Sequence, residues 1–463
     1  MANVQTWLSR YVMGVYIFLF FFASAGHARD DLACKIGQMI MVGFEGTNVP
    51  DTLVVDLQKR HLGGVILFAH NMENPEQIKR LTSNLMEKAD LPLLIATDQE
   101  GGHVARLGKN NGFAETYSAF QLGTVFNSED STRAMAARMA SWMSQTGINM
   151  NLAPVVDVNI NPDSPAIGHW ERSFSDDPER VALHAGWFIE EFHRRNVITT
   201  LKHFPGHGSA KQDSHLGFTD VTATWTEKEL VPYQALFANH LADVVMVGHL
   251  FNANLDPKYP ATLSDATVSG ILQSKLGFQG VVISDEMFMG AITYNYSFDE
   301  AIELAINAGI DILLYRTNLI NGRSLVQQII TTVSQKVAMG KISSQRIDSA
   351  YAKILALKAK WFNLTTVRNY TAGAIQPNRF ELRSYPNPFI NLTHIQIRLE
   401  KTAHVKVQVL DLMGRQVALI ADQTFRSGKY QFAFRAGNLP SGIYFIKLQA
   451  SGKTLVRKIS LVR

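Results

Sequence analysis

The chain has 463 residues, of which 46% are hydrophobic and 18% are charged, and its net charge is +4 at pH 7. This length and composition allow two or three folded domains with large cores and exclude a generally disordered chain. The charge is uneven, because residues 385–463 hold 12 of the 44 basic and 3 of the 40 acidic residues, which suggests two parts with different roles.

Residues 1–28 have the features of a secretory signal peptide. Arg10 precedes the apolar run YVMGVYIFLFFFASA, which ends in small residues suited to cleavage. The run is short for a bilayer span and no other stretch is long and apolar enough, so we expect export without a stable membrane span. Cys34 is the only cysteine, which excludes an intrachain disulfide. Lipidation of Cys34 is disfavoured, because Asp31 stands where an apolar residue is required.

Between residues 35 and 360, short apolar runs alternate with stretches of helical periodicity. Each run is apolar nearly throughout, as in strands that are buried on both faces. Eight such strands with helical crossovers predict an α/β fold, a (β/α)8 TIM-type barrel. An open doubly wound sheet is the alternative, but no glycine-rich dinucleotide fingerprint follows the first strand. The predicted strands lie in MIMVGF (39–44), GVILFAH (64–70), LPLLIATD (91–98), MNLAPVVDV (150–158), VITTLKHF (197–204), DVVMVGHL (243–250), GVVISDE (280–286) and IDILLY (310–315).

The remainder of the chain has a different pattern. Residues 361–384 show no clear period and are predicted to be a linker. Residues 385–463 contain segments that alternate apolar and polar residues between Gly, Asn and Pro turns, which predicts a small antiparallel β-sandwich. The basic residues of this part alternate with apolar ones, as on the solvent face of strands, so we expect no nucleic-acid partner.

Ionisable residues follow most of the predicted barrel strands, and in a parallel barrel the active site forms at these carboxyl ends. Asp285 ends the seventh run, where a carboxylate can attack carbon or act as a base. Asp213 and His215 are two residues apart in the stretch KHFPGHGSAKQDSH (202–215), so an extended loop points both to one side. An aspartate beside an imidazole fixes its tautomer and favours its charged form, which suits proton transfer to a leaving oxygen.

The same region permits a metal site. Its candidate ligands, of the types that zinc prefers, are His203, His207, Asp213, His215 and His249. However, Lys202 directly precedes the first of these histidines, and the first strand lacks the His-x-His pair that metallohydrolase barrels typically carry. We therefore expect neither a metal nor an organic cofactor.

Four segments in series resemble the β-N-acetylglucosaminidase branch of glycoside hydrolase family 3. They read DQEGGHVARL, ERSFSDDPERV, KHFPGHGSAKQDSH and GVVISDEMFM, and the resemblance covers about residues 35–360. It implies that Asp285 is the nucleophile, that His215 is the acid/base residue and that Asp213 is its partner. It also implies a set of substrate-binding residues, namely Asp98, Arg106, Arg172, Lys202 and His203.

Two positions depart from the family pattern. The family usually has arginine where this chain has His103, and small or Asp-Leu neighbours where Glu286 and Met287 follow Asp285. Glu286 would add negative charge beside the nucleophile if it faced the site. Strand alternation predicts that it points away.

Segments of the C-terminal part resemble the C-terminal sorting domain of the Bacteroidetes type IX secretion system. They read YPNPF, VKVQVLDLMGRQV and SGIYFIKL. The resemblance implies the secretion machinery as a partner and a secreted or outer-membrane surface location. A carbohydrate-binding sandwich is the alternative, for which Tyr430 and Phe432 are candidate platforms.

The resemblances together imply a secreted, retaining exo-β-N-acetylglucosaminidase that needs no cofactor. Its expected partner is an oligosaccharide from chitin, peptidoglycan or glycoconjugates, and we expect a monomer. A β-glucosidase or a phosphate-dependent glycosidase of the same family is the alternative among enzymes. A surface glycan-binding protein without turnover is the alternative outside enzymes.

Overall fold

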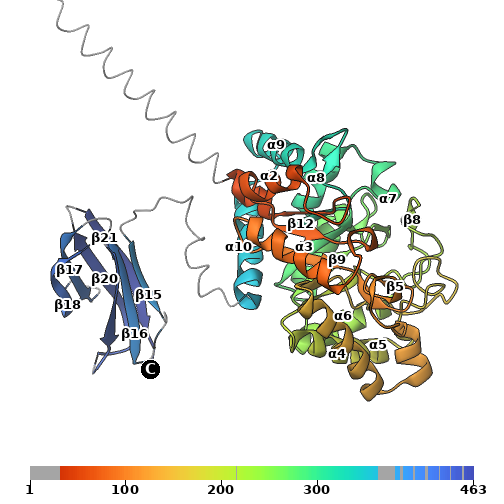
Figure 1. The fold of residues 1–463 in the computed structure, drawn as a ribbon, viewed down its shortest axis with the longest axis horizontal. Coiled ribbons are helices and arrows are strands. Elements are labelled where there is room, and N and C mark those ends of the chain that lie inside the picture. The colour runs from red at the N-terminus through yellow and green to blue at the C-terminus, as the bar shows by residue number, and fades with distance from the viewer. Residues whose placement is uncertain are drawn as a thin grey trace, which may run out of the picture. The chain divides into compact units, whose positions relative to one another are not determined.

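The computed structural model describes residues 32–362 except His215, and residues 381–462 except 386–388, 390, 400–401, 412–414, 427, 438 and 451–452. The predicted signal peptide therefore lies outside the described residues. The chain divides into two compact units, residues 1–372 and 373–463 (Figure 1).

The first unit contains a closed barrel of eight parallel strands. The first strand pairs with the last on one side and with the second on the other, so the sheet has no edge. Each of the eight predicted runs contains one strand, which confirms the barrel prediction, and the open doubly wound alternative is wrong. The strands are β1 (Ile40–Val42), β2 (Gly64–Ile66), β3 (Leu94–Thr97), β6 (Met150–Asn151), β7 (Ile198–Phe204), β9 (Val244–Val247), β11 (Val281–Glu286) and β12 (Ile312–Tyr315).

Helices connect the strands and pack around the barrel (Figure 1). They are α2 (Asp51–Lys59), α3 (Pro75–Lys88), α4 (Glu129–Gln145), α5 (Pro178–His193), α6 (Val231–Ala238), α7 (Gly290–Thr293), α8 (Phe298–Ala308), α9 (Leu325–Ala338) and α10 (Ser344–Trp361), with π-helical turns at Gln121–Phe126 and Ala266–Lys275. Shorter elements in the loops are β4 (Gln99–Gly101), β5 (Val104–Ala105), β8 (Thr219–Asp220), β10 (Leu250–Phe251), β13 (Leu319–Ile320), β14 (Arg323–Ser324) and the 3-10 turns Ala69–Asn71, Lys109–Asn111, Glu227–Leu230 and Ala261–Leu263.

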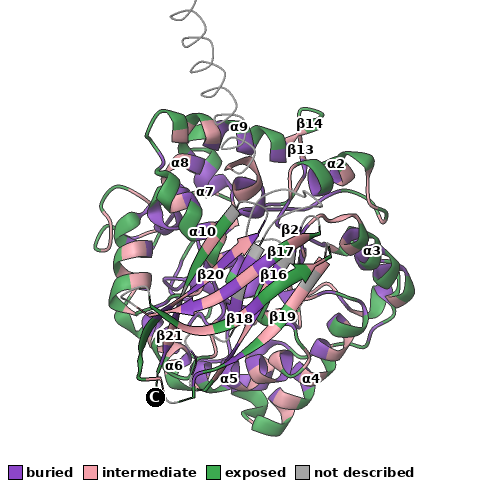
Figure 2. Cartoon of the chain, turned by 90° about the vertical axis from the view of Figure 1, so that its left-hand side faces the viewer, coloured by how far each residue is buried: buried purple, intermediate pink, exposed green. Residues whose placement is uncertain are grey.

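The sequence sets the helix boundaries through capping residues. Asn74 accepts a hydrogen bond from the first turn of α3, and Asp177 does the same for α5. Both helices have proline at their first position, where its missing N–H has no partner to lose. Each helix buries the apolar face that its periodicity predicts and exposes the opposite face (Figure 2).

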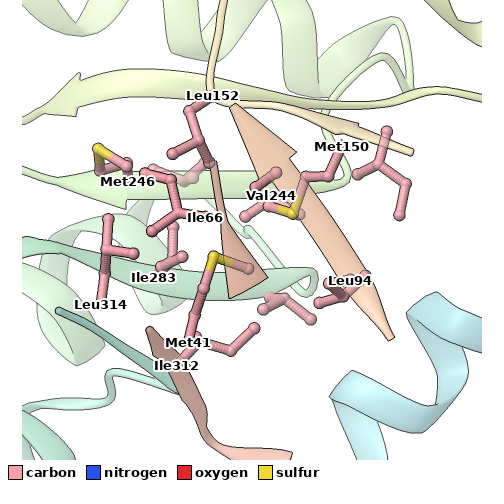
Figure 3. Packing of buried hydrophobic residues seen from close by; sticks show 14 of the residues in the cluster. Met41, Ile66, Leu94, Met150, Leu152, Val244, Met246, Ile283, Ile312 and Leu314 are labelled. Carbon is pink, nitrogen blue, oxygen red and sulfur yellow. The ribbon is translucent and has the colours of Figure 1, made fainter. Parts of the chain in front are cut away.

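Apolar side chains from the strands fill the barrel interior, so it is a packed core and not a pore (Figure 3). The ten labelled residues are between 0 and 3% exposed. They are Met41, Ile66, Leu94, Met150, Leu152, Val244, Met246, Ile283, Ile312 and Leu314. Any ligand of the barrel must therefore bind at one of its two ends.

Helix α10 covers the amino end of the barrel. Its residues Arg346 and Lys353 pair with Asp311, which directly precedes β12. Its residue Lys358 is fully buried and donates hydrogen bonds to the Gln38 side chain and to the carbonyl oxygen of Gly63, just before β1 and β2. These contacts close one end of the barrel and leave the carboxyl end for a ligand.

The second unit contains two antiparallel sheets, as predicted for a β-sandwich. One has the strand order β15-β16-β19 and the other β18-β17-β20-β21. The strands are β15 (Glu381–Tyr385), β16 (Leu392–Leu399), β17 (Ala403–Leu410), β18 (Gln416–Phe425), β19 (Gly428–Arg435), β20 (Gly442–Ala450) and β21 (Lys453–Leu461). Alternate residues of β17 and β20, including Val405, Val407 and Ile446, are buried in a common core.

The described part of the chain holds no helix that is apolar and long enough to cross a membrane. Strand β15 begins at Glu381, inside the segment that the sequence pattern assigns to the linker.

Candidate active site

A cavity of about 610 Å³ opens where the barrel strands end. The last interior side chains of four strands form its floor, and loops that follow the strands form its walls. Seven of the eight predicted site residues line this cavity, namely Asp98, Arg106, Arg172, Lys202, His203, Asp213 and Asp285. The eighth, His215, lies outside the described residues, so its predicted role stays a prediction.

Two carboxylates and two cations form an ionic cluster on one side of the cavity. Its members are Asp98, Glu100, Lys202 and Arg172. The Lys202 ammonium lies 2.8 Å from an oxygen of Asp98 and 2.7 Å from an oxygen of Glu100. The Arg172 guanidinium binds both oxygens of Glu100, each at 2.8 Å. Arg106 makes a longer contact of 3.4 Å with Asp98. The cluster is fully connected, yet its members line the cavity and can exchange partners with a polar ligand.

The cluster keeps its acids ionised. Burial acts to raise the pKa of both carboxyls, but the cations beside them outweigh it. Lys202 and Arg106 lower the pKa of Asp98, and Arg172 and Lys202 lower the pKa of Glu100 well below its usual range. The pKa of Lys202 is raised in return, because its nearby carboxylates outweigh its burial. The cavity therefore presents charged donors and acceptors side by side to a polar ligand.

The sequence interpretation did not identify Glu100. The signal was present, because Glu100 follows Asp98 by two residues in TDQEGG, and this spacing lets two side chains of an extended segment face one side. Strand β4 supplies that extended segment. The sequence also predicts that Arg172 binds substrate. In the structure Arg172 lines the cavity, while two of its guanidinium nitrogens bind Glu100 and the third donates to the Ala166 carbonyl. Its contact with substrate stays a prediction.

His203 is held by an aspartate that the sequence interpretation missed. Asp157 is fully buried, and one of its oxygens lies 2.8 Å from Nδ1 of His203. Its other oxygen accepts the backbone N–H groups of His203 and His207 at 3.0 and 2.8 Å. Because Nδ1 donates to Asp157, Nε2 is left as an acceptor, and it lies 3.3 Å from Arg172. The sequence pattern did not indicate Asp157 as a site residue, because it lies within an apolar run.

Two buried residues, His207 and Glu229, hold the loop after β7 in place. His207 is buried and does not line the cavity, and its Nε2 lies 3.1 Å from the Ser214 hydroxyl. Burial lowers the pKa of His207 to about 4, so the ring is neutral. Glu229 accepts the N–H of Gly208 at 2.9 Å, and burial raises its pKa to about 8. A side chain at Gly206 would collide with Glu229, which explains the glycine there.

Asp285 and Glu286 end strand β11 and both line the cavity. The prediction that Glu286 points away is wrong, because the pairing register of β11 with β12 shifts between Ile283 and Glu286 and breaks the strand alternation. One carboxylate oxygen of Glu286 accepts the backbone N–H groups of Phe288 and Arg316. Burial raises the pKa of Glu286, because it disfavours the charged form of the carboxyl.

The remaining candidate ligands of the sequence analysis are dispersed. Both ring nitrogens of His249 have polar partners, the Thr262 hydroxyl at 2.8 Å and the carbonyl oxygen of Glu286 at 3.0 Å. Within the described ranges, no three His, Cys, Asp or Glu side chains are grouped so that they could hold a metal ion.

Comparisons with known proteins agree with this fold. The model of the glycosyl hydrolase family 3 N-terminal domain matches residues 31–357, and the model of the secretion system C-terminal sorting domain matches residues 383–462. The Haemophilus influenzae β-hexosaminidase is 31% identical over 357 residues, which are 71% of this chain and 99% of that protein. The Pseudoalteromonas piscicida β-hexosaminidase A is 31% identical over 68% of this chain.

The solved structure of a family 3 β-N-acetylglucosaminidase from Paenibacillus is similar, with a TM-score of 0.66 and 34% identity over 75% of this chain. The matched region covers 64% of that chain and 56% of the Pseudoalteromonas protein. The chain thus spans somewhat over half the length of these two relatives.

Proposed function

The chain belongs to glycoside hydrolase family 3, and we propose that it is a secreted, retaining exo-β-N-acetylglucosaminidase. One observation carries the proposal: the Asp285 carboxylate and the ionic cluster of Asp98, Glu100, Lys202 and Arg172 line one cavity. A nucleophile thus stands beside groups that can hold a sugar. The relatives named β-hexosaminidase and β-N-acetylglucosaminidase support this choice of sugar.

The ionic cluster binds the terminal sugar. Asp98 accepts hydrogen bonds from hydroxyl groups, and Lys202 and Arg106 donate to hydroxyl oxygens. Nε2 of His203 can accept from a sugar hydroxyl in exchange for Arg172, because Asp157 holds the proton on Nδ1. These charged groups hold one another in position, so their geometry is set before a sugar exchanges with one of the partners.

Hydrolysis proceeds in two displacements. Asp285 attacks the anomeric carbon as the bond to the leaving oxygen breaks, and His215, oriented by Asp213, gives that oxygen its proton. The product of this step is a glycosyl ester of Asp285. His215, now neutral, takes a proton from water, whose oxygen displaces Asp285 and restores the original configuration. Neither step requires a metal or an organic cofactor.

The proposed location follows from the two ends of the chain. The match to the sorting domain over residues 383–462 supports secretion or a cell-surface position. Residues 1–28 supply the signal for the inner membrane and the sorting domain engages the secretion machinery. The substrate is therefore an external glycan, an oligosaccharide of chitin, peptidoglycan or glycoprotein.

The test compares aryl β-N-acetylglucosaminide with aryl β-glucoside, each with and without phosphate. We expect the N-acetylglucosaminide to be hydrolysed at least tenfold faster, with no acceleration by phosphate. Proton NMR of the first turnovers should show the β anomer of free N-acetylglucosamine. Preference for the glucoside, a sugar 1-phosphate product or an initial α anomer would each contradict part of the proposal.

A further inference from the structure

The side chains that line the cavity differ between its interior and its mouth. Its interior carries the ionic cluster and Asp285, whereas three aromatic side chains, Trp170, His103 and Tyr294, are exposed and also line it. Trp170 is 45% exposed. A single exposed aromatic residue is ordinary on a protein surface, but a half-exposed tryptophan in the wall of a cavity leaves an apolar surface available for a ligand.

Trp170 is presented by a rigid loop. The loop folds back on itself, because the backbone N–H of His169 donates to Ser164 and that of Arg172 donates to Ile167. Two residues after the indole, the Arg172 guanidinium is locked onto Glu100. The position of Trp170 is thereby fixed relative to the ionic cluster.

Two histidines support the indole ring. The rings of His103 and His169 contact Trp170 at centroid distances of 5.6 and 5.2 Å, and both contacts are edge-on, with interplanar angles of 72° and 86°. Neither ring stacks parallel on the indole. Edge-on contacts of this kind hold an aromatic ring in place, while 45% of the residue stays exposed to solvent.

We infer that Trp170 forms the binding site for the sugar on the leaving-group side of the scissile bond. The inference rests on the proposed function, in which the ionic cluster binds the terminal sugar and leaves the mouth of the cavity for the next one. A β-linked pyranose has a face made of C–H groups, and this face packs on an aromatic ring. The ligand class is therefore a β-linked hexosaminide whose aglycone is itself a pyranose.

The test separates the two sugars by the choice of substrate. N-acetylglucosaminyl azide has a leaving group without a ring, so it uses the terminal-sugar site alone, whereas chitobiose and chitotriose use both sites. We expect Trp170→Ala to lower kcat/KM about tenfold on chitobiose and chitotriose, the size of one aromatic contact, and less than twofold on the azide. Trp170→Phe should recover most of the loss.

The matched control is Phe126→Ala, because Phe126 is also an exposed aromatic residue of the barrel unit, at 42%, but does not line the cavity. It should leave both substrates unchanged. Equal losses on the azide and on chitobiose for Trp170→Ala would mean that the residue acts only through Arg172, and no loss on either would mean that it binds nothing. Both outcomes overturn the inference.

Failure of the proposed function gives a different result. In that case the wild-type protein would cleave neither the azide nor chitobiose, or it would prefer the corresponding glucosyl azide and cellobiose. With the glucosyl pair, the same comparison of Trp170→Ala would still support or overturn the leaving-group site.

Discussion

The two ends of the barrel contain ion pairs of the same residue types, but these pairs have different roles. At the carboxyl end, Lys202 and Arg172 pair with the buried acids Asp98 and Glu100 beside a cavity. At the amino end, Arg346 and Lys353 of α10 pair with Asp311, whose side chain is fully buried. A buried ion pair by itself therefore does not mark an active site. What marks it is a cavity that the paired groups line.

The difference also separates the effects of mutation. Groups that line the cavity can exchange partners with substrate, so their loss affects turnover. Groups beneath α10 have only protein partners, and their loss affects the free energy of unfolding. Substitutions at the two ends of the barrel should therefore separate turnover from stability.

Asp285→Ala should lower kcat on aryl β-N-acetylglucosaminide about 10⁴-fold or more, because no other group then forms the glycosyl ester. The free energy of unfolding should change by less than about 1 kcal/mol, since the side chain lines a cavity. Steady-state kinetics and urea unfolding measure the two quantities. A variant that keeps more than a hundredth of the wild-type kcat would remove Asp285 from the mechanism.

Asp311→Ala should have the opposite profile. It leaves the partly buried Arg346 guanidinium without the fully buried carboxylate of Asp311, and this costs about 3 kcal/mol of unfolding free energy. The kcat of the folded enzyme, measured well below its melting temperature, should stay within twofold of wild type. Asp348→Ala is the matched control on α10, because Asp348 is exposed and pairs only with Lys35 among the contacts described. A large loss of kcat in Asp311→Ala would show that the two ends are coupled.

Glu229 sharpens the comparison, because it supports the loop of the active end but does not line the cavity. Its pKa is raised to about 8 by burial, so the folded protein binds this proton more tightly than the unfolded chain. Stability should therefore fall as pH rises from about 4.5 to about 8, by about 3 kcal/mol at pH 7.

Glu229→Gln should remove this pH dependence, which urea unfolding at a series of pH values measures. Glu227→Gln is the control on the same turn, because Glu227 is exposed. If Glu229→Gln had the same stability profile as wild type from pH 5 to 8, the buried acid would not be protonated as described.

His103→Arg restores the residue usual in the family and should have the smallest effect. His103 lies at the edge of Trp170 and is exposed, so we expect kcat/KM on aryl β-N-acetylglucosaminide to change less than threefold. A tenfold gain would show that this position holds the terminal sugar directly.

The sequence predicted the barrel and most of the site for the same reason. Strands buried on both faces are apolar throughout, so the polar residues that end them, such as Asp98, Lys202 and Asp285, stand out. Asp157 was missed because it lies inside such a run, and the orientation of Glu286 was mistaken because a register shift breaks the alternation. The contacts of α10 with Asp311 join residues far apart in the chain, and no local pattern indicates such partners.

The proposed mechanism depends on a covalent bond between Asp285 and the sugar, and trapping this intermediate would identify the nucleophile. A 5-fluoro N-acetylglucosaminyl fluoride slows both displacements and lets the glycosyl-enzyme accumulate, so the labelled residue can be found by mass spectrometry of the digested protein. We expect one added sugar per chain, on Asp285. A label on another residue, or an active enzyme that turns over this reagent without any label, would contradict it.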